Sequence, residues 1–174
     1  WGDWDTPTWS KYFGLAMADA TGDGFQDIVS GRYFYRNPGG AMTAAWTRVD
    51  LGLNCDAGLF SDVDGDGWAD VIAPAGDKVY WLEATASDGS TWSNTVIDAA
   101  FPKPDHGNPQ GYRSAQILEG GRPEILLNGD SLYLYTVPET SPETGGWSRV
   151  AIVAESNGEG IGIGDIDGDG DLDV

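Results

Sequence analysis

The chain has little cysteine, histidine or positive charge. Its 174 residues include one cysteine, Cys55, and one histidine, His106, so the sequence excludes both an internal disulfide and a zinc cluster of cysteines and histidines. Nine lysines and arginines stand against 28 acidic residues, and the net charge of −19 argues against nucleic-acid binding, which needs a basic surface. No apolar run approaches about 18 residues, so no membrane-spanning segment is predicted.

Glycine and tryptophan, by contrast, are abundant, with 26 and 8 copies. Glycine-containing turns between short aromatic and β-branched runs are typical of an all-β fold. The hydrophobic content of 40% is enough for a packed core, which argues against an acidic disordered tail. The length fits one ordinary domain.

One acidic stretch organises the sequence. Residues 62–70 read Asp-Val-Asp-Gly-Asp-Gly-Trp-Ala-Asp, with aspartates at positions one, three, five and nine. Carboxylates this close repel one another unless a cation lies among them, and Ca²⁺ takes roughly six to eight oxygen ligands. The alternate spacing predicts that positions one, three and five turn inward together, while glycine permits the turn. The backbone carbonyl of position seven and the carboxylate of position nine complete the predicted shell.

The same pattern recurs in loop 19–27, with threonine at position three, and in full in loop 165–173. Each copy predicts one structural calcium site, about three in all. The predicted ligands are Asp19, Thr21, Asp23, Phe25 and Asp27; Asp62, Asp64, Asp66, Trp68 and Asp70; and Asp165, Asp167, Asp169, Asp171 and Asp173.

An EF-hand, a magnesium site and acidic turns without metal are the alternatives to a calcium loop. An EF-hand needs glutamate at position twelve and helical flanks, but that position is Ser30 or Ala73 and the flanks resemble strands. Magnesium prefers fewer carboxylates and more water than this pattern offers. Acidic turns on a solvated rim, without metal, are the third alternative, and the regular spacing in three copies favours calcium over them.

The long gap between the second and third loops contains a degenerate copy at residues 116–124. Glu124 stands at position nine, but positions one, three and five lack acidic residues, so this loop is predicted to hold no metal. The repeat length is then about 40–50 residues, as in solenoids and propellers.

Each repeat has the same predicted series of strands. One strand precedes the loop (14–18, 58–60, 113–117, 160–164), a second leaves it (27–30, 70–73, 124–127), a third follows a tight turn (33–36, 79–82, 132–135), and a fourth begins at tryptophan (46–49, 92–97, 147–152). Four strands per repeat are typical of β-propeller blades. The predicted blades lie near residues 12–52, 56–99, 110–154 and 158–174.

The loops Asp-x-(Asp/Thr)-Gly-Asp-Gly-x-x-Asp, with β-branched residues after them, resemble the FG-GAP/VCBS repeats of integrin α-chain propellers. They are also similar to repeats of secreted microbial and fungal propellers, including a fungal sugar-binding lectin. The resemblance extends from about residue 13 to 174. It implies a secreted protein, a calcium loop between the first two strands of each blade, and a ring of about seven blades. We therefore expect further blades beyond Val174 or from associating copies.

Ligand binding is expected on the face opposite the acidic loops, where the strand 2–3 turns and the links between blades lie. The longest link, residues 99–113, contains His106, Tyr112 and Arg113. These residue types suit a polysaccharide lyase, which neutralises a uronate and moves protons. An ordinary surface loop is the alternative.

A second candidate site consists of aromatic residues near the amino terminus. Exposed aromatic faces can stack on sugar rings. The residues concerned are Trp1, Trp4, Trp9 and Tyr12. Trp46, Trp92 and Trp147 occupy equivalent positions in the repeats, which predicts packing between blades instead.

The sequence thus predicts a calcium-stabilised, secreted β-propeller module that binds a ligand, with carbohydrate favoured. A propeller-based polysaccharide lyase or sugar dehydratase, and an integrin-like protein-adhesion module, are the alternatives. Neither nucleic acid nor membrane insertion is expected.

Overall fold

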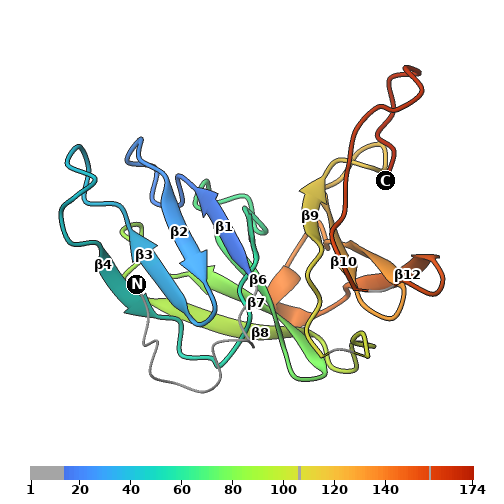
Figure 1. Cartoon of the computed structure of the whole chain (residues 1–174), viewed down its shortest axis with the longest axis horizontal. Coiled ribbons are helices and arrows are strands. Elements are labelled where there is room, and N and C mark those ends of the chain that lie inside the picture. Colours follow the sequence, from blue (N-terminus) through green and yellow to red (C-terminus); the bar gives the residue numbers. More distant parts are fainter. Residues whose placement is uncertain (1–13, 106, 157) are drawn as a thin grey trace.

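The computed structural model describes residues 14–105, 107–156 and 158–174 and is built almost entirely of strands. The strands form three four-stranded antiparallel sheets, and within each sheet they lie in sequence order (Figure 1). The described helical structure is a short 3₁₀ turn, η2 (Pro142–Thr144). None of the described residues form a helix with the length and apolar character needed to cross a bilayer. The predicted all-β class is confirmed.

Each sheet uses a continuous stretch of chain. The first sheet contains β1 (Leu15–Ala18), β2 (Asp27–Ser30), β3 (Tyr33–Arg36) and β4 (Thr47–Asp50). The second contains β5 (Leu59–Ser61), β6 (Asp70–Ala75), β7 (Lys78–Ala84) and β8 (Trp92–Asp98). The third contains β9 (Tyr112–Ala115), β10 (Glu124–Asn128), β11 (Leu132–Thr136) and β12 (Ser148–Val153).

The predicted strands agree with these bounds to within a few residues, except for the strand expected at 160–164. There the described chain forms only an isolated bridge between Gly164 and Asp173. A strand needs a partner to accept and donate its backbone hydrogen bonds. Each preceding repeat supplies that partner as the strand leaving the loop, whereas here the described pairing is limited to the hydrogen bonds that Gly164 and Asp173 exchange.

The second sheet packs on both neighbours through alternating residues of β6. Val71 and Ala73 join Phe34 of the first sheet in one apolar cluster. Ile72, on the opposite face of the strand, joins Ile125 of the third sheet in another. All five side chains are buried. This alternation follows from the two-residue period of a strand, and it explains why β6 is apolar on both faces.

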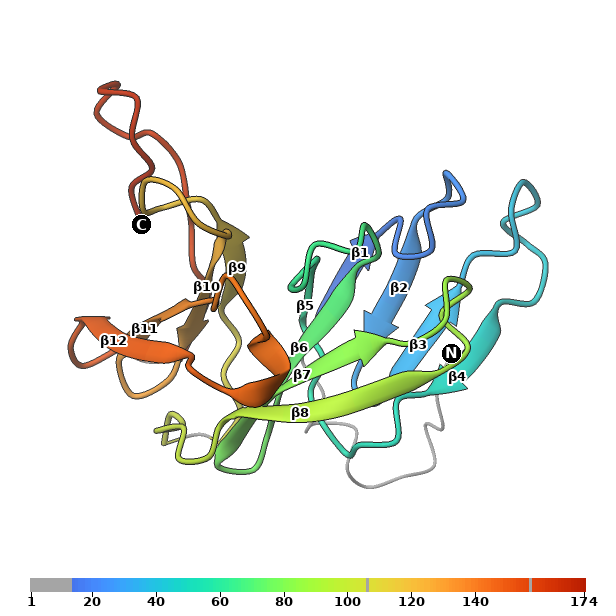
Figure 2. The same ribbon diagram turned by 180° about the vertical axis from the view of Figure 1, so that it is seen from behind.

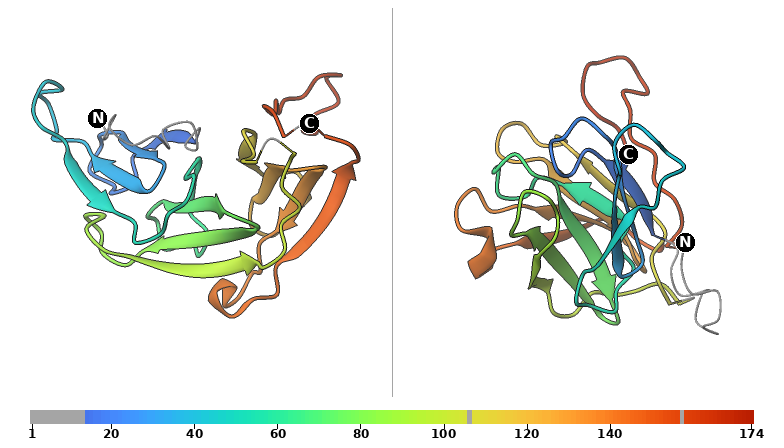
Figure 3. Two further views of the ribbon diagram at one scale, coloured as in Figure 1. Left: turned by 60° about the horizontal axis from the view of Figure 1, so that its bottom comes forward. Right: turned by 90° about the vertical axis from the view of Figure 1, so that its left-hand side faces the viewer.

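The first strands of the three sheets lie next to one another. β1 contacts β5, and β5 contacts β9. The sheets follow one another along an open arc (Figures 2 and 3). Close approach near the start of β1 requires glycine, because a Cβ atom on Gly14 would lie 2.3 Å from the carbonyl oxygen of Ala57.

A polar network joins the second and third sheets at Asp98. Its carboxylate accepts a hydrogen bond from the Tyr135 hydroxyl at 2.7 Å and an ion-paired hydrogen bond from Arg149. The Asp98 side chain is only 12% exposed. The Arg149 guanidinium also lies 4.9 Å from the centre of the Tyr133 ring, a favourable cation–π distance.

Replacing Asp98 with alanine should lower the free energy of unfolding by about 2–3 kcal/mol, because Tyr135 and Arg149 both lose a mostly buried charged partner. Urea unfolding monitored by tryptophan fluorescence measures this loss. Asp50→Ala is the matched control, since Asp50 is 49% exposed in its ion pair with Arg32. That change should cost less than about 1 kcal/mol. Equal losses for the two variants would contradict the bridging role of Asp98.

Candidate metal-binding loops

The acidic loops emerge on one side of the molecule. Loop 19–27 joins β1 to β2, loop 62–70 joins β5 to β6, and the degenerate loop 116–124 joins β9 to β10. Together with loop 165–173 they lie at the top of Figure 1. In loops 19–27 and 62–70, position nine is the first residue of the following strand, so the sheet fixes the end of each loop.

Glycines at positions four and six give the loops their shape. Gly65 and Gly67 have φ angles of 79° and 91°, in the region that other residues rarely adopt. The equivalent glycines of loops 19–27 and 165–173 also have positive φ angles. The predicted turn chemistry of the glycines is therefore confirmed.

The carboxylate at position one organises each loop by accepting backbone hydrogen bonds. Asp62 accepts from the amides of Gly65 and Gly67 at 2.8 and 3.1 Å. Asp165 accepts from the equivalent amides at 2.7 and 3.1 Å. In loop 19–27 the amides of positions five and six donate to Asp19, at 3.0 and 2.9 Å. The loop backbone is thereby drawn around this side chain.

In loops 19–27 and 62–70, position nine is buried and connects the loop to the sheet. The amide of Val63 at position two donates to Asp70 Oδ2, and the amide of Ala84 at the end of β7 donates to Asp70 Oδ1, both at 3.1 Å. Asp27 receives the equivalent two bonds from Ala20 and Asn37, at 3.2 and 2.8 Å. The aspartate at position nine thus has a structural role that the ligand prediction did not include.

Burial raises the pKa of Asp70 to about 7. The nearby indole N–H of Trp81 and the two backbone donors oppose this rise. Trp81 Nε1 does not reach hydrogen-bonding geometry with any described group. A cation beside Asp70 would favour its charged form and offset the cost of burial. The pKa of Asp27 is also raised, mainly by burial.

The carboxylates at positions one, three and nine come together in two of the loops. Ligand oxygens of Asp62, Asp64 and Asp70 lie within 4.8 Å of one another, and those of Asp165, Asp167 and Asp173 do so too. Position five lies outside these groups, and Asp66 instead accepts a hydrogen bond from the amide of Trp68 at 2.8 Å. Clustered carboxylate oxygens are the donor set that a hard divalent cation such as Ca²⁺ prefers.

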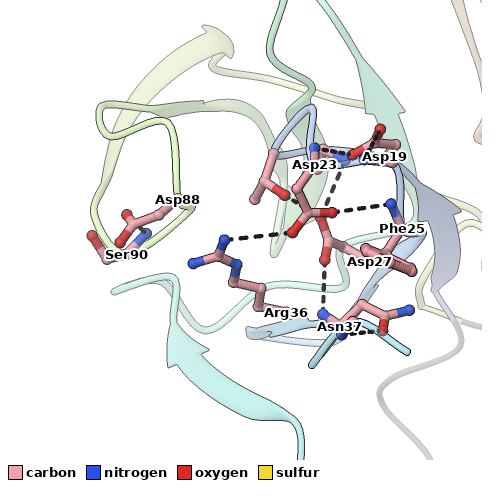
Figure 4. A network of polar contacts seen from close by, with 12 residues as sticks. Asp19, Asp23, Phe25, Asp27, Arg36, Asn37, Asp88 and Ser90 are labelled. Atoms are coloured by element: carbon pink, nitrogen blue, oxygen red, sulfur yellow. Dashed lines mark hydrogen bonds and ion pairs between the residues drawn. The ribbon is translucent and has the colours of Figure 1, made fainter. Parts of the chain in front are cut away.

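Loop 19–27 differs at two places. Thr21 occupies position three, and its hydroxyl lies 3.3 Å from Asp27 Oδ2, to which it donates. Asp23, at position five, pairs with Arg36 at 3.4 Å, as Figure 4 shows. The chain thus provides its own positive charge at this loop.

Loop 116–124 closes through hydrogen bonds. The side-chain amide of Gln116, at position one, donates to the carbonyls of Leu118 and Gly120 at 2.6 Å each. Glu124 accepts from the amides of Ile117 and Leu118, and the first of these bonds, from position two, is the one that position nine also receives in the other loops. A neutral amide here holds the loop together without clustered carboxylates. That the loop binds no metal stays a prediction.

The remaining candidate residues are placed only in part. Tyr112 is 5% exposed, and its hydroxyl donates to the Pro109 carbonyl at 2.6 Å. Burial raises its pKa, and Arg113 donates to the backbone carbonyl of Tyr112. This environment does not favour proton transfer by Tyr112. The candidates that lie outside the described residues are His106, Trp1, Trp4, Trp9 and Tyr12.

Two of the repeated tryptophans pack between sheets, as predicted. The Trp92 ring lies 5.3 Å from that of Phe34 in the neighbouring sheet. Trp147 packs against the cluster shared by the second and third sheets. Trp46 is half-buried and joins none of the three core clusters formed by the described residues, so its packing between blades stays a prediction.

Comparison of the chain with protein-family models, curated proteins and solved structures finds no match. Proposals about its function therefore rest on its own residues and their geometry.

Proposed function

We propose that this chain is part of a calcium-stabilised, secreted β-propeller of the FG-GAP/VCBS type that binds a carbohydrate. The observation that carries the calcium part is the convergence of carboxylates at positions one, three and nine within 4.8 Å, in loops about a hundred residues apart. The donor chemistry fits calcium, and the glycine conformations at positions four and six leave the loop backbone wrapped around the carboxylates.

Calcium in these loops would have a structural role. The position-nine carboxylate already connects the loop to the sheet. An ion bound by positions one and nine would therefore hold the start and the end of the loop together. Filling the shell with protein oxygens leaves little room for a substrate at the metal. The expected effect is added stability that grows with the concentration of free calcium.

The arrangement of the sheets supports the propeller part of the proposal. In a propeller, consecutive four-stranded sheets lie side by side around an axis, with their first strands innermost. The contacts of β1 with β5 and of β5 with β9 agree with that order, as does the position of the loops between first and second strands on one side. The remaining blades would come from a longer chain or from associating copies.

The proposed ligand surface lies on the side opposite the acidic loops. There the link 99–111 is anchored by backbone hydrogen bonds, among them those from the Phe101 amide to the Asp77 carbonyl at 2.7 Å and from the Asp130 amide to the Pro102 carbonyl at 2.9 Å. Lys103 and Asp105 are exposed on this link and can form hydrogen bonds with sugar hydroxyls. The buried, hydrogen-bonded Tyr112 hydroxyl favours a binding module over a lyase.

A glycan array probed with the full chain in millimolar calcium tests the carbohydrate assignment. We expect binding to a restricted set of glycans, weakened severalfold by a Lys103→Ala/Asp105→Ala variant. Arg48→Ala/Glu143→Ala serves as the matched control, because it removes one positive and one negative exposed charge from strand β4 and from the β11–β12 link, outside the proposed surface, and should bind as the unmodified chain does. Absence of binding to every glycan would contradict the carbohydrate assignment and leave the calcium sites to be judged separately.

A further inference from the structure

The acidic loops differ in the positive charge that the chain places beside them. Arg36, the last residue of β3, directs its guanidinium at Asp23 of loop 19–27, with 3.4 Å between Nη2 and Oδ2. Both side chains are partly exposed, at 37% and 29%. Within the described part of the chain, no ion pair joins a basic side chain to the carboxylates of loops 62–70 or 165–173. Arg122 of loop 116–124 also reaches loop 62–70, but it donates to the backbone carbonyl of Val63 and not to a carboxylate. Among the acidic loops of the described chain, loop 19–27 is the one in which a basic side chain pairs with a carboxylate.

Arg36 also lies beside a second carboxylate, Asp88, in the β7–β8 turn of the neighbouring sheet. Figure 4 shows the guanidinium between Asp23 and Asp88. Hydrogen bonds from Ser90 and the positive charge of Arg36 both hold the pKa of Asp88 below its usual range. Asp88 forms no ion pair within 4.0 Å among the described residues, so its charge is free to take a closer partner.

The turn that carries Asp88 is held against the first sheet. Gly89 packs so closely on Phe34 that a Cβ atom would lie 2.5 Å from the ring. The indole of Trp92 donates to the Gly89 carbonyl at 2.8 Å, and Trp92 in turn packs on Phe34. Asp88 therefore stays near Arg36 whatever loop 19–27 does.

We propose that Arg36 is a counter-ion switch that pairs with Asp23 when loop 19–27 lacks calcium and with Asp88 when calcium takes Asp23. This inference rests on the calcium-binding function proposed above. Before calcium can use Asp23, the guanidinium must move away, and its charge continues to repel the ion at short range. Loop 19–27, which also has Thr21 in place of a carboxylate, is then the weakest of the three calcium sites.

The loops can be followed one by one through their glycine amides. Gly24, Gly67 and Gly170 each donate to the position-one carboxylate of their own loop, at 2.9, 3.1 and 3.1 Å. The amide chemical shift of each glycine should respond when calcium engages that carboxylate. Titrating the ¹⁵N-labelled full chain with CaCl₂ gives a dissociation constant for each loop. The Gly24 resonance should need a higher calcium concentration to shift than the resonances of Gly67 and Gly170.

Arg36→Gln should tighten calcium binding at Gly24 by about three- to tenfold, the effect of removing one partly screened charge near a divalent ion. The responses of Gly67 and Gly170 should not change. Arg48→Gln is the matched control, because it removes the same charge from the adjacent strand β4, where Arg48 lies over the Tyr33 ring. It should leave all three dissociation constants within about twofold of the unmodified chain.

Asp88→Asn tests the second half of the switch. It should weaken calcium binding at Gly24 about threefold in the unmodified chain, because Arg36 loses its alternative partner. In an Arg36→Gln background the same change should have no effect. Equal effects of Asp88→Asn in both backgrounds would overturn the transfer to Asp88.

The calcium titration distinguishes absent calcium sites from an absent switch. If none of the three glycines responds to calcium, the calcium sites themselves are wrong. If they respond but Arg36→Gln behaves as the unmodified chain or as Arg48→Gln does, calcium binding stands and the switch is overturned.

Discussion

Removing calcium is expected to lower the free energy of unfolding by about 5 kcal/mol. A ligand that binds only the folded chain stabilises it by RT ln(1 + [L]/Kd). Extracellular calcium modules have dissociation constants near ~10⁻⁴ M, so each occupied loop contributes about 2 kcal/mol at ~2 mM calcium. The three loops act on the same folded state, so their contributions add. Thermal and urea unfolding, in calcium and in excess EGTA, measure the difference.

Magnesium provides the control for this experiment. It requires near-ideal octahedral geometry and releases its waters reluctantly, so the same concentration should restore little of the lost stability. Equal melting temperatures in calcium and in EGTA would contradict a structural role for the ion. Full recovery in magnesium would contradict the choice of metal.

Replacing Asp70 with alanine should destabilise the chain by about 3–4 kcal/mol even without calcium. The amides of Val63 and Ala84 both donate to this carboxylate, and both lose their acceptor in the variant. An unsatisfied buried donor costs about 1–3 kcal/mol. Asp70 is only 1% exposed, so water has little access to replace the lost acceptor. Urea unfolding in EGTA measures this loss in the absence of any metal effect.

Asp66→Ala is the matched control within the same loop. Asp66 is exposed and, within the described chain, accepts a hydrogen bond from the amide of Trp68 alone, so in EGTA its loss should change stability by less than about 0.5 kcal/mol. In calcium, where the ion would draw Asp66 in as the ligand expected from the sequence, the change should remove about 2 kcal/mol and lower the calcium stoichiometry by one. Equal losses of stability for Asp70→Ala and Asp66→Ala in EGTA would contradict the structural role of Asp70.

The strands were predicted well because the ends of a strand depend mostly on residues that are close in sequence. β2 and β3 begin and end at the predicted residues, since Asp27 and Gly31 mark the turns on either side. The strand expected at 160–164 was wrong because pairing depends on a partner elsewhere in the chain. The apolar residues there serve another purpose, and Ile161 is buried against Leu134 of the third sheet.

The candidate site was predicted in part. The spacing of the aspartates identified the loops, and the glycines indicated their shape. The burial of Asp70 could not be predicted from the loop alone, because its second hydrogen-bond donor, Ala84, lies at the end of a different strand. Likewise the Asp23–Arg36 pair and the Asp98 network join residues far apart in sequence, and no local pattern indicates which arginine meets which carboxylate.

The number of calcium ions bound per chain tests the central claim most directly. The chain is dialysed against calcium, and the bound metal is counted by native mass spectrometry and elemental analysis. We expect three ions, one each for loops 19–27, 62–70 and 165–173, and none for loop 116–124. A double variant, Asp62→Asn/Asp165→Asn, should retain one. A chain that binds no calcium under these conditions would contradict the claim.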